Sequence, residues 1–123
     1  MSFPIMKLTE AGKTILAKAH SGEPLNFTRI SIGSGVLSDT TASPSSLVKE
    51  EFSLQIAQIH VNEGIAHITA MLDNSGITEG FYWREIGLYA GNVLYAYANS
   101  GEHAEYIPAY TTASFYRTKI GIA

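Results

Sequence analysis

Two pairs of alternating apolar runs, each joined by a two-residue turn signal, constrain the fold of this chain more than any other feature. The four runs are Gln55 to Asn62, Ile65 to Leu72, Trp83 to Ala90 and Val93 to Ala98. Glu63-Gly64 joins the first two runs, and Gly91-Asn92 joins the last two. Apolar residues at every second position predict strands, and a glycine in a two-residue connection predicts that the strands pair antiparallel. We therefore expect two β-hairpins.

The turns also predict a register for each hairpin. For the first, the expected pairs are Val61–Ala66, Ile59–Ile68 and Ala57–Ala70 on one face, and Gln58–Thr69, His60–His67 and Ile56–Met71 on the other. For the second, they are Leu88–Tyr95 and Ile86–Tyr97 on one face, and Tyr89–Leu94 and Gly87–Ala96 on the other. Since the Ile56–Met71 pair is apolar, one end of the first hairpin is expected to be covered on both sides.

Helical spacing is seen before the hairpins. One face of the predicted helix carries Leu8, Ala11, Ile15, Leu16 and Ala19. Thr9 is the expected N-cap and Gly22 the expected stop. An amphipathic helix needs a sheet beneath its apolar face, and residues 27–32 alternate as a half-buried strand does.

The remaining segments complete a single α+β domain. Residues 113–122 predict a final strand, residues 33–46 and 99–112 predict long loops, and residues 47–51 predict a helical turn. The predicted architecture is one N-terminal amphipathic helix packed on a mainly antiparallel β-sheet or sandwich, with two β-hairpins and long loops. We expect residues 1–123 to form one domain, because a chain of this length supports one core.

Composition limits the classes of partner. The chain has a formal net charge of −3 and scattered cations, so we expect no binding to nucleic acid. No run approaches the ~18 apolar residues of a membrane span, so we expect no membrane insertion. There is no cysteine for a disulfide, a thiolate metal site or a cysteine nucleophile. The start lacks a basic cluster followed by an apolar run, which predicts synthesis in the cytoplasm.

Two candidate ligand sites are weak. His60 and His67 are expected to face each other across the first hairpin, but a metal needs three or four ligands, which symmetry in an oligomer could supply. The favoured interpretation is a structural pair. Gly33-Ser34-Gly35 is similar to part of a phosphate-binding loop, but lacks the third glycine and the following lysine, so a turn is favoured.

No segment predicts catalysis. None of Ser31, Ser34 and Ser38 lies in the context of a nucleophile. Glu102 and Glu105 flank His103 in a loop, where acids and histidines also meet by chance. We therefore expect no catalytic residue, no metal and no cofactor.

Aromatic residues indicate a protein interface. Ten of the 13 lie between Phe81 and Tyr116, among few charges. Tyrosine rings bury area while the hydroxyl still finds partners, which is typical of protein contacts. The predicted interface residues are Phe81, Tyr82, Trp83, Arg84, Glu85, Tyr106, Pro108 and Tyr110. A core role is equally open for Trp83. Arg84 and Glu85 are neighbours on a strand and point to opposite faces, so Arg84 is expected to bind loop carbonyls or an acid.

Six segments together resemble the phage tail-collar fibre family, found at the head of side-tail fibres in phages and prophages. They are Leu8 to Gly12, Ala17 to Ala19, Leu25 to Gly35, Glu79 to Ala90, Leu94 to Asn99 and Tyr106 to Pro108. The resemblance implies a structural component of the virion tail that fastens a fibre to the baseplate while the rest of the fibre reaches the host. It also implies a homotrimer that binds baseplate proteins, and no catalytic residues.

One departure and one alternative stay open. Family members run on past residues 116–123 into a shaft, so this sequence is either a truncated fibre or a stand-alone adaptor. The alternative function is a module that binds a cell-surface glycan, because tyrosine and tryptophan stack on sugar rings. An enzyme acting on envelope polymers is disfavoured, since no carboxylate pair with a defined separation is evident.

Overall fold

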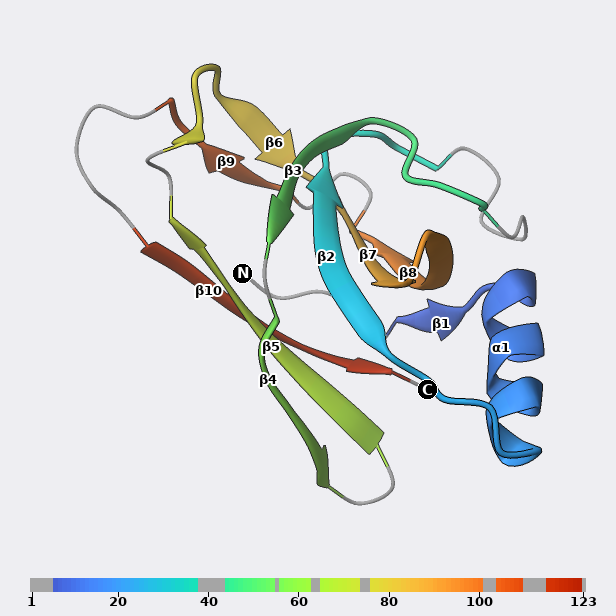
Figure 1. Ribbon diagram of the computed structural model, residues 1–123. Coiled ribbons are helices and arrows are strands. Elements are labelled where there is room, and N and C mark those ends of the chain that lie inside the picture. The colour runs from blue at the N-terminus through green and yellow to red at the C-terminus, as the bar shows by residue number, and fades with distance from the viewer. Residues whose placement is uncertain are drawn as a thin grey trace.

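Strands form most of the chain, and one helix follows the first short strand. This computed structural model describes residues 6–37, 44–54, 56–62, 65–73, 76–100, 104–109 and 115–122. The elements are β1 Lys7–Leu8, α1 Glu10–His20, β2 Phe27–Gly33, β3 Glu50–Leu54, β4 Ile56–Asn62, β5 Ile65–Asp73, β6 Phe81–Trp83, β7 Glu85–Ala90, β8 Val93–Asn99, β9 Glu105–Ile107 and β10 Phe115–Ile122. They form antiparallel sheets ordered β1-β8-β7-β2-β3, β10-β5-β4 and β6-β9 (Figure 1). The predicted α+β class is confirmed.

Helix α1 begins at the predicted N-cap and lies against β8. The Oγ1 of Thr9 accepts a hydrogen bond from the Gly12 N–H at 2.9 Å, and Gly22, with φ of 102°, follows the last turn. Leu8 belongs to β1 and not to the helix, because its backbone pairs with β8 at the sheet edge. A Cβ on Gly12 would lie 2.0 Å from the Tyr95 carbonyl oxygen, so only glycine allows this close packing. Among the described residues, no helix is long and apolar enough to cross a membrane.

The hairpin β7–β8 forms as predicted, but it contains a bulge. Tyr89 pairs with Leu94, as expected. The predicted Leu88–Tyr95 pair is wrong, because Leu88 pairs with Ala96 and Tyr95 is an extra residue on β8. The Tyr95 ring packs in the core and its carbonyl oxygen accepts the Thr9 N–H at 3.0 Å, which fixes the bulge to the start of α1.

This bulge changes the face on which Tyr97 lies. Ile86 pairs with Ala98 and Gly87 pairs with Tyr97, so the predicted Ile86–Tyr97 and Gly87–Ala96 pairs are also wrong. Opposite residues of an antiparallel pair share a face, so Tyr97 lies on the face of Gly87 and of Glu85, two residues away. The bulge therefore brings a tyrosine hydroxyl to the side of the sheet that carries a buried acid.

The hairpin β4–β5 contains a second bulge. The pairs Val61–Ala66, Ile59–Ile68, Gln58–Thr69 and His60–His67 are confirmed. Ile56 pairs with Ala70, so Ala57 is the extra residue, and the predicted Ala57–Ala70 and Ile56–Met71 pairs are wrong. Ile56 therefore packs against the core cluster that contains Ile68 instead of facing away from it. The expectation that this end of the hairpin is covered on both faces rested on the Ile56–Met71 pair and loses that support. Residues 63–64, the predicted turn, lie outside the described part. Strand β10 confirms the predicted final strand and pairs with β5.

Arg84 divides what the alternation predicts to be a single strand. Its N–H donates to the Gly33 carbonyl oxygen, and its own carbonyl oxygen accepts the Ser100 N–H, each at 2.8 Å. β6 thereby leaves the five-stranded sheet and pairs with β9. β9 lies within residues 99–112, so the prediction of a loop throughout that segment is wrong.

The segment after β2 is less exposed than predicted. Gly35 and Leu47 are buried, so the prediction of a surface loop over residues 33–46 fails at Gly35. Residues 47–49 form no helical turn, and β3, which the sequence did not predict, begins directly after them. The backbone N–H groups of Gly35, Val48 and Lys49 all donate to one buried carboxylate, that of Glu85.

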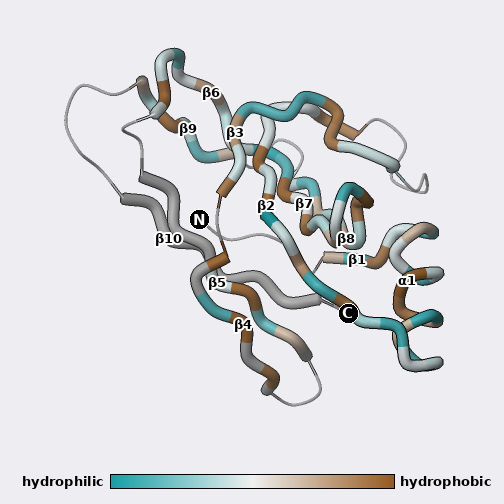
Figure 2. Tube along the Cα trace, viewed as in Figure 1, coloured by the Kyte–Doolittle hydropathy of each residue, from teal (hydrophilic) through white to brown (hydrophobic). Residues whose placement is uncertain are grey.

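The main core lies where the three sheets meet. Its buried members include Ile30, Ile32, Ile86 and Leu88 of the five-stranded sheet, Ile68 of the three-stranded sheet, and Phe81, Trp83 and Ile107 of β6 and β9. A smaller cluster of Leu47, Tyr89, Leu94 and Tyr97 is separate from it. Figure 2 shows hydrophobic residues also along β4, in the hairpin that projects from the body.

Candidate partner-binding surface and its buried anchor

The predicted interface residues divide into exposed and buried members. Tyr82 and Tyr106 are 49% and 51% exposed, and Pro108 is exposed. Arg84 is half-buried. The side chains of Phe81, Trp83 and Glu85 are buried within the chain, so only the other members can touch a partner directly. Tyr110 lies outside the described residues. We call Tyr82, Arg84, Tyr106 and Pro108 the aromatic surface.

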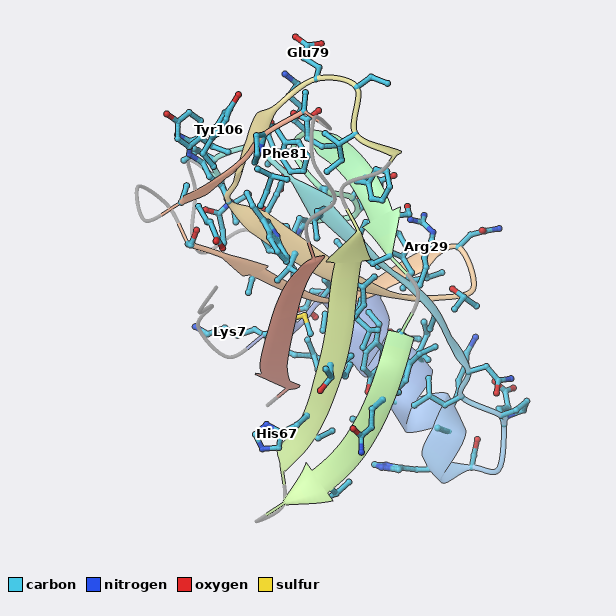
Figure 3. All side chains as sticks on the ribbon, turned by 90° about the vertical axis from the view of Figure 1, so that its left-hand side faces the viewer. Lys7, Arg29, His67, Glu79, Phe81 and Tyr106 are labelled. Atoms are coloured by element: carbon cyan, nitrogen blue, oxygen red, sulfur yellow. The ribbon has the colours of Figure 1, made fainter. Side chains whose placement is uncertain are left out.

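Tyr82 and Tyr106 form a cross-strand pair between β6 and β9. Their ring centroids lie 5.0 Å apart with an interplanar angle of 62°, an edge-to-face arrangement. Gly80 lies directly beside the Tyr106 hydroxyl, and a Cβ there would come within 2.1 Å of it. Figure 3 shows Tyr106 at the end of the molecule that carries β6 and β9, while His67 lies at the opposite end. The pair is thus a fixed, half-exposed aromatic edge.

Arg84 joins this aromatic edge to the segment after β2. Its guanidinium carbon lies 5.0 Å from the Tyr82 ring centroid, within the range of a cation–π contact. Its Nη1 donates to the Ser34 carbonyl oxygen at 3.4 Å. The prediction that Arg84 binds a loop carbonyl is confirmed.

Glu85, the next residue, is fully buried and accepts four hydrogen bonds. Its Oε1 accepts the Val48 N–H at 2.9 Å and the Tyr97 hydroxyl at 2.6 Å. Its Oε2 accepts the Gly35 N–H at 3.0 Å and the Lys49 N–H at 2.8 Å. Three backbone N–H groups and one hydroxyl thus replace the water that a carboxylate loses on burial.

Tyr97 and Asn99 extend this network from Glu85 to the Gly35 carbonyl oxygen. The Asn99 Nδ2 donates to the Tyr97 hydroxyl at 3.0 Å and to the Gly35 carbonyl oxygen at 3.1 Å. Burial raises the pKa of Tyr97 well above its usual value, and the hydrogen bond to Glu85 raises the pKa further, because the proton is held between two oxygens. The hydroxyl therefore stays protonated as a donor at ordinary pH.

The glycines around Glu85 are needed for close approach. A Cβ on Gly33 would lie 2.5 Å from the Glu85 Oε2, and a Cβ on Gly35 would lie 2.7 Å from it. Within Gly33-Ser34-Gly35, the Gly35 N–H donates to an anion, whereas the Ser34 N–H donates to the Lys49 carbonyl oxygen. The anion is the carboxylate of Glu85, so the backbone N–H groups that donate to it bind a side chain of the same chain and not a separate ligand.

One known protein family matches most of the chain. The sequence model described as phage tail-collar fibre protein, N-terminal, matches residues 2–112. The chain belongs to this family. No curated protein and no solved structure matches it.

Family membership makes the chain a tail-fibre component of the virion tail, in a family whose role is structural. It does not favour the glycan-binding alternative. The segment Glu79 to Ala90, which carries the resemblance, contains both Tyr82 of the aromatic surface and the anchor Glu85. In this tail-collar fibre domain, one short segment thus supplies an exposed ring and the carboxylate that holds the neighbouring backbone.

The anchoring role of Glu85 escaped the sequence interpretation, which assigned it to an interface. The available signal was an acid inside the apolar run from Trp83 to Ala90, because a buried charge must be paired or hydrogen-bonded. That signal indicates that Glu85 needs hydrogen-bond donors, but it does not identify the donor residues. The partners come from 36 to 50 residues away along the chain, except Tyr97.

The other candidate sites of the tail-collar fibre domain gain no support as ligand sites. His60 and His67 are opposite one another in the backbone register. Within the described ranges, no group of three or more histidine, aspartate or glutamate residues could hold a metal. Glu102 and His103 lie outside the described residues. Ser31 is buried and its hydroxyl is hydrogen-bonded by Arg29, as in a structural role.

Proposed function

We propose that this domain fastens a tail fibre to the phage baseplate through the aromatic surface. The observation that carries the proposal is the Tyr82–Tyr106 pair, half-exposed and held edge-to-face on a two-stranded sheet. Rigid tyrosines bury large areas with little loss of side-chain entropy, and tyrosine and arginine dominate binding energy in protein interfaces. Family membership supplies the tail context in which such a contact is needed.

The buried anchor supports the same role. Glu85 ties residues 35, 48 and 49 together, and Arg84 beside it contacts both Ser34 and the Tyr82 ring. The aromatic surface is thus braced before any partner arrives. A braced surface loses less conformational freedom on binding, which favours tight attachment of a part that bears load.

A reconstitution experiment tests the proposal. Tails made without this gene product are mixed with the purified full chain, and the bound chain is measured after co-sedimentation. Tyr82→Ala and Tyr106→Ala should each reduce binding about tenfold or more, as expected for anchor residues. The matched control is Val93→Ala, which removes another exposed apolar side chain, on β8. Retention of full binding by the Tyr82→Ala, Tyr106→Ala double variant would refute the proposal.

Three further assignments belong to the same proposal. Residues 1–123 act as one attachment domain, the domain is made in the bacterial cytoplasm before it joins the virion, and three copies assemble in each fibre. The resemblance to fibre proteins and the low charge content of 15% support the three-copy assembly. Sedimentation equilibrium of the full chain measures the copy number directly.

A further inference from the structure

Arg84 is a half-buried cation that uses little of its hydrogen-bonding capacity inside the chain. A guanidinium offers several N–H donors, yet the one acceptor that Arg84 reaches among the described residues is the Ser34 carbonyl oxygen, 3.4 Å from its Nη1. The Arg84 Nε is enclosed by protein and has no hydrogen-bond partner. The Nη2 also lacks an acceptor in the described part of the chain, but it is not enclosed. The outer edge of the guanidinium is therefore open to a further acceptor.

The charge of Arg84 is not balanced by an acid of the described chain. Within the described ranges, no aspartate or glutamate forms an ion pair with Arg84. Both carboxylate oxygens of Glu85 are occupied by backbone N–H groups. Glu51 accepts the Ser34 hydroxyl at 2.6 Å and lies 3.8 Å from the Lys49 Nζ. A cation held partly out of water without an acid is unfavourable, so this position favours an acid from outside the chain.

A second arginine of the chain has the same aromatic contact with its acid present. The Arg29 guanidinium carbon lies 3.8 Å from the Tyr89 ring centroid, and its Nη1 lies 3.4 Å from the Glu50 Oε1. Arg84 has the aromatic contact, at 5.0 Å from the Tyr82 ring centroid, and a backbone acceptor. The group that Arg84 lacks, and that Arg29 has, is a carboxylate.

We propose that Arg84 binds an aspartate or glutamate side chain of the protein that docks on the aromatic surface. The inference rests on the proposed attachment and adds the chemistry of the partner. A planar guanidinium binds a carboxylate through two parallel hydrogen bonds, which a lysine ammonium cannot reproduce. The Tyr82 ring and the Ser34 carbonyl oxygen hold the guanidinium in place, so its orientation is set before the partner arrives.

Docking on the two tyrosines would strengthen this ion pair. A partner that covers Tyr82 removes water from the neighbouring guanidinium, and charges attract more strongly where water is excluded. The charge also fixes how the partner is oriented and disfavours a partner with a cation at that position. The site lies within one chain, so each copy in a fibre would carry a complete site of its own.

Arg84→Gln and Arg84→Glu separate recognition of charge from recognition of shape, because the two new side chains differ mainly in charge. Both are titrated in the reconstitution experiment with tails made without this gene product. Arg84→Gln should weaken binding about thirtyfold or more, as expected when one partner of a docked ion pair is truncated. Arg84→Glu should weaken it at least about tenfold further, because two carboxylates would then face each other. Arg84→Lys keeps the charge without the planar fork and should recover only part of the loss.

The matched control is Arg29→Gln, which removes a cation from the face of another tyrosine. Figure 3 shows Arg29 apart from the end of the molecule that carries Tyr106, so this variant should bind as the wild type does. Equal binding by Arg84→Gln and Arg84→Glu, or equal losses in Arg84→Gln and Arg29→Gln, would overturn the carboxylate site.

The failure of this inference is distinguishable from the failure of the attachment proposal. If the Tyr82→Ala, Tyr106→Ala double variant loses binding while Arg84→Gln keeps it, the attachment stands and the carboxylate site is wrong. Full binding by the double variant overturns both. Urea unfolding supplies a further check, since Arg84→Gln should unfold close to the wild-type midpoint after losing one long hydrogen bond. A large fall in that midpoint would show that the guanidinium is already used inside the fold, which also overturns the site.

Discussion

Glu85 is the buried charge on which the loop after β2 depends, and Glu85→Gln isolates that charge with little change in shape. The carboxylate accepts hydrogen bonds from three backbone N–H groups and from the Tyr97 hydroxyl. An amide has one accepting oxygen. Its oxygen can face Gly35 and Lys49, but its NH₂ group then faces the Val48 N–H and the Tyr97 hydroxyl.

The magnitude follows from those lost partners. The Val48 N–H is left without an acceptor, which costs about 1–3 kcal/mol for a buried donor. The Tyr97 hydroxyl loses its charged acceptor, and the two remaining bonds lose their charge assistance, which adds about 1–2 kcal/mol. A neutral amide is easier to remove from water than a carboxylate, which offsets part of the loss. We expect Glu85→Gln to lower the free energy of unfolding by about 2–4 kcal/mol.

Urea unfolding at pH 7 measures this change, which is a large part of the ~5–15 kcal/mol of a small domain. The matched control is Glu50→Gln, the same substitution at an exposed acid that lies 3.4 Å from Arg29. Exposed ion pairs contribute about 0–1 kcal/mol, so the control should stay close to wild type. If the two variants lose equal stability, or if Glu85→Gln loses less than about 0.5 kcal/mol, the anchoring role of the carboxylate is refuted.

Three further predictions concern the same framework. Gly35→Ala should lower the free energy of unfolding by about 1–3 kcal/mol, because its Cβ would lie 2.4 Å from the Val48 Cβ; wild-type stability in urea would contradict this. Thr9→Ala should cost about 1–2 kcal/mol by removing the cap on the Gly12 N–H, and Thr9→Ser should restore most of it in the same assay. The raised pKa of Tyr97 stabilises the fold fully below pH 10 and less as pH rises above it, because the unfolded chain then releases the proton first. Tyr97→Phe should therefore flatten the alkaline loss of stability, as followed by circular dichroism between pH 8 and pH 11, and an unchanged slope would show that Tyr97 does not cause it.

Local patterns predicted the elements well because their causes are local. Thr9 and Gly22 set the ends of α1 through a side-chain cap and a positive φ, both of which depend on neighbouring residues. The alternation of apolar residues likewise predicted both hairpins and the correct pairing near each turn, such as Tyr89 with Leu94. Register is reliable close to a turn, since the turn geometry fixes it there.

Farther from the turns the register failed at one extra residue in each hairpin. Tyr95 bulges where β8 meets the start of α1, and Ala57 bulges where β4 leaves the core. Ile56 and Ala57 are both apolar and residues 93–98 are apolar throughout, so neither pattern distinguishes a bulge from a strand that is covered on both sides. Contacts with other parts of the fold decide the position, in one case the hydrogen bond from the Thr9 N–H to the Tyr95 carbonyl oxygen.

The sequence by itself determined the fold class, the helix with its caps, the two hairpins and the family to which the chain belongs, because composition, alternation and short motifs carry that information. Only the tertiary structure decided that Tyr82 and Tyr106 are exposed while Phe81, Trp83 and Glu85 are buried. The physical reason is distance along the chain. A buried carboxylate takes its hydrogen bonds from whichever backbone folds over it, and those N–H groups carry no side-chain identity that a sequence could display.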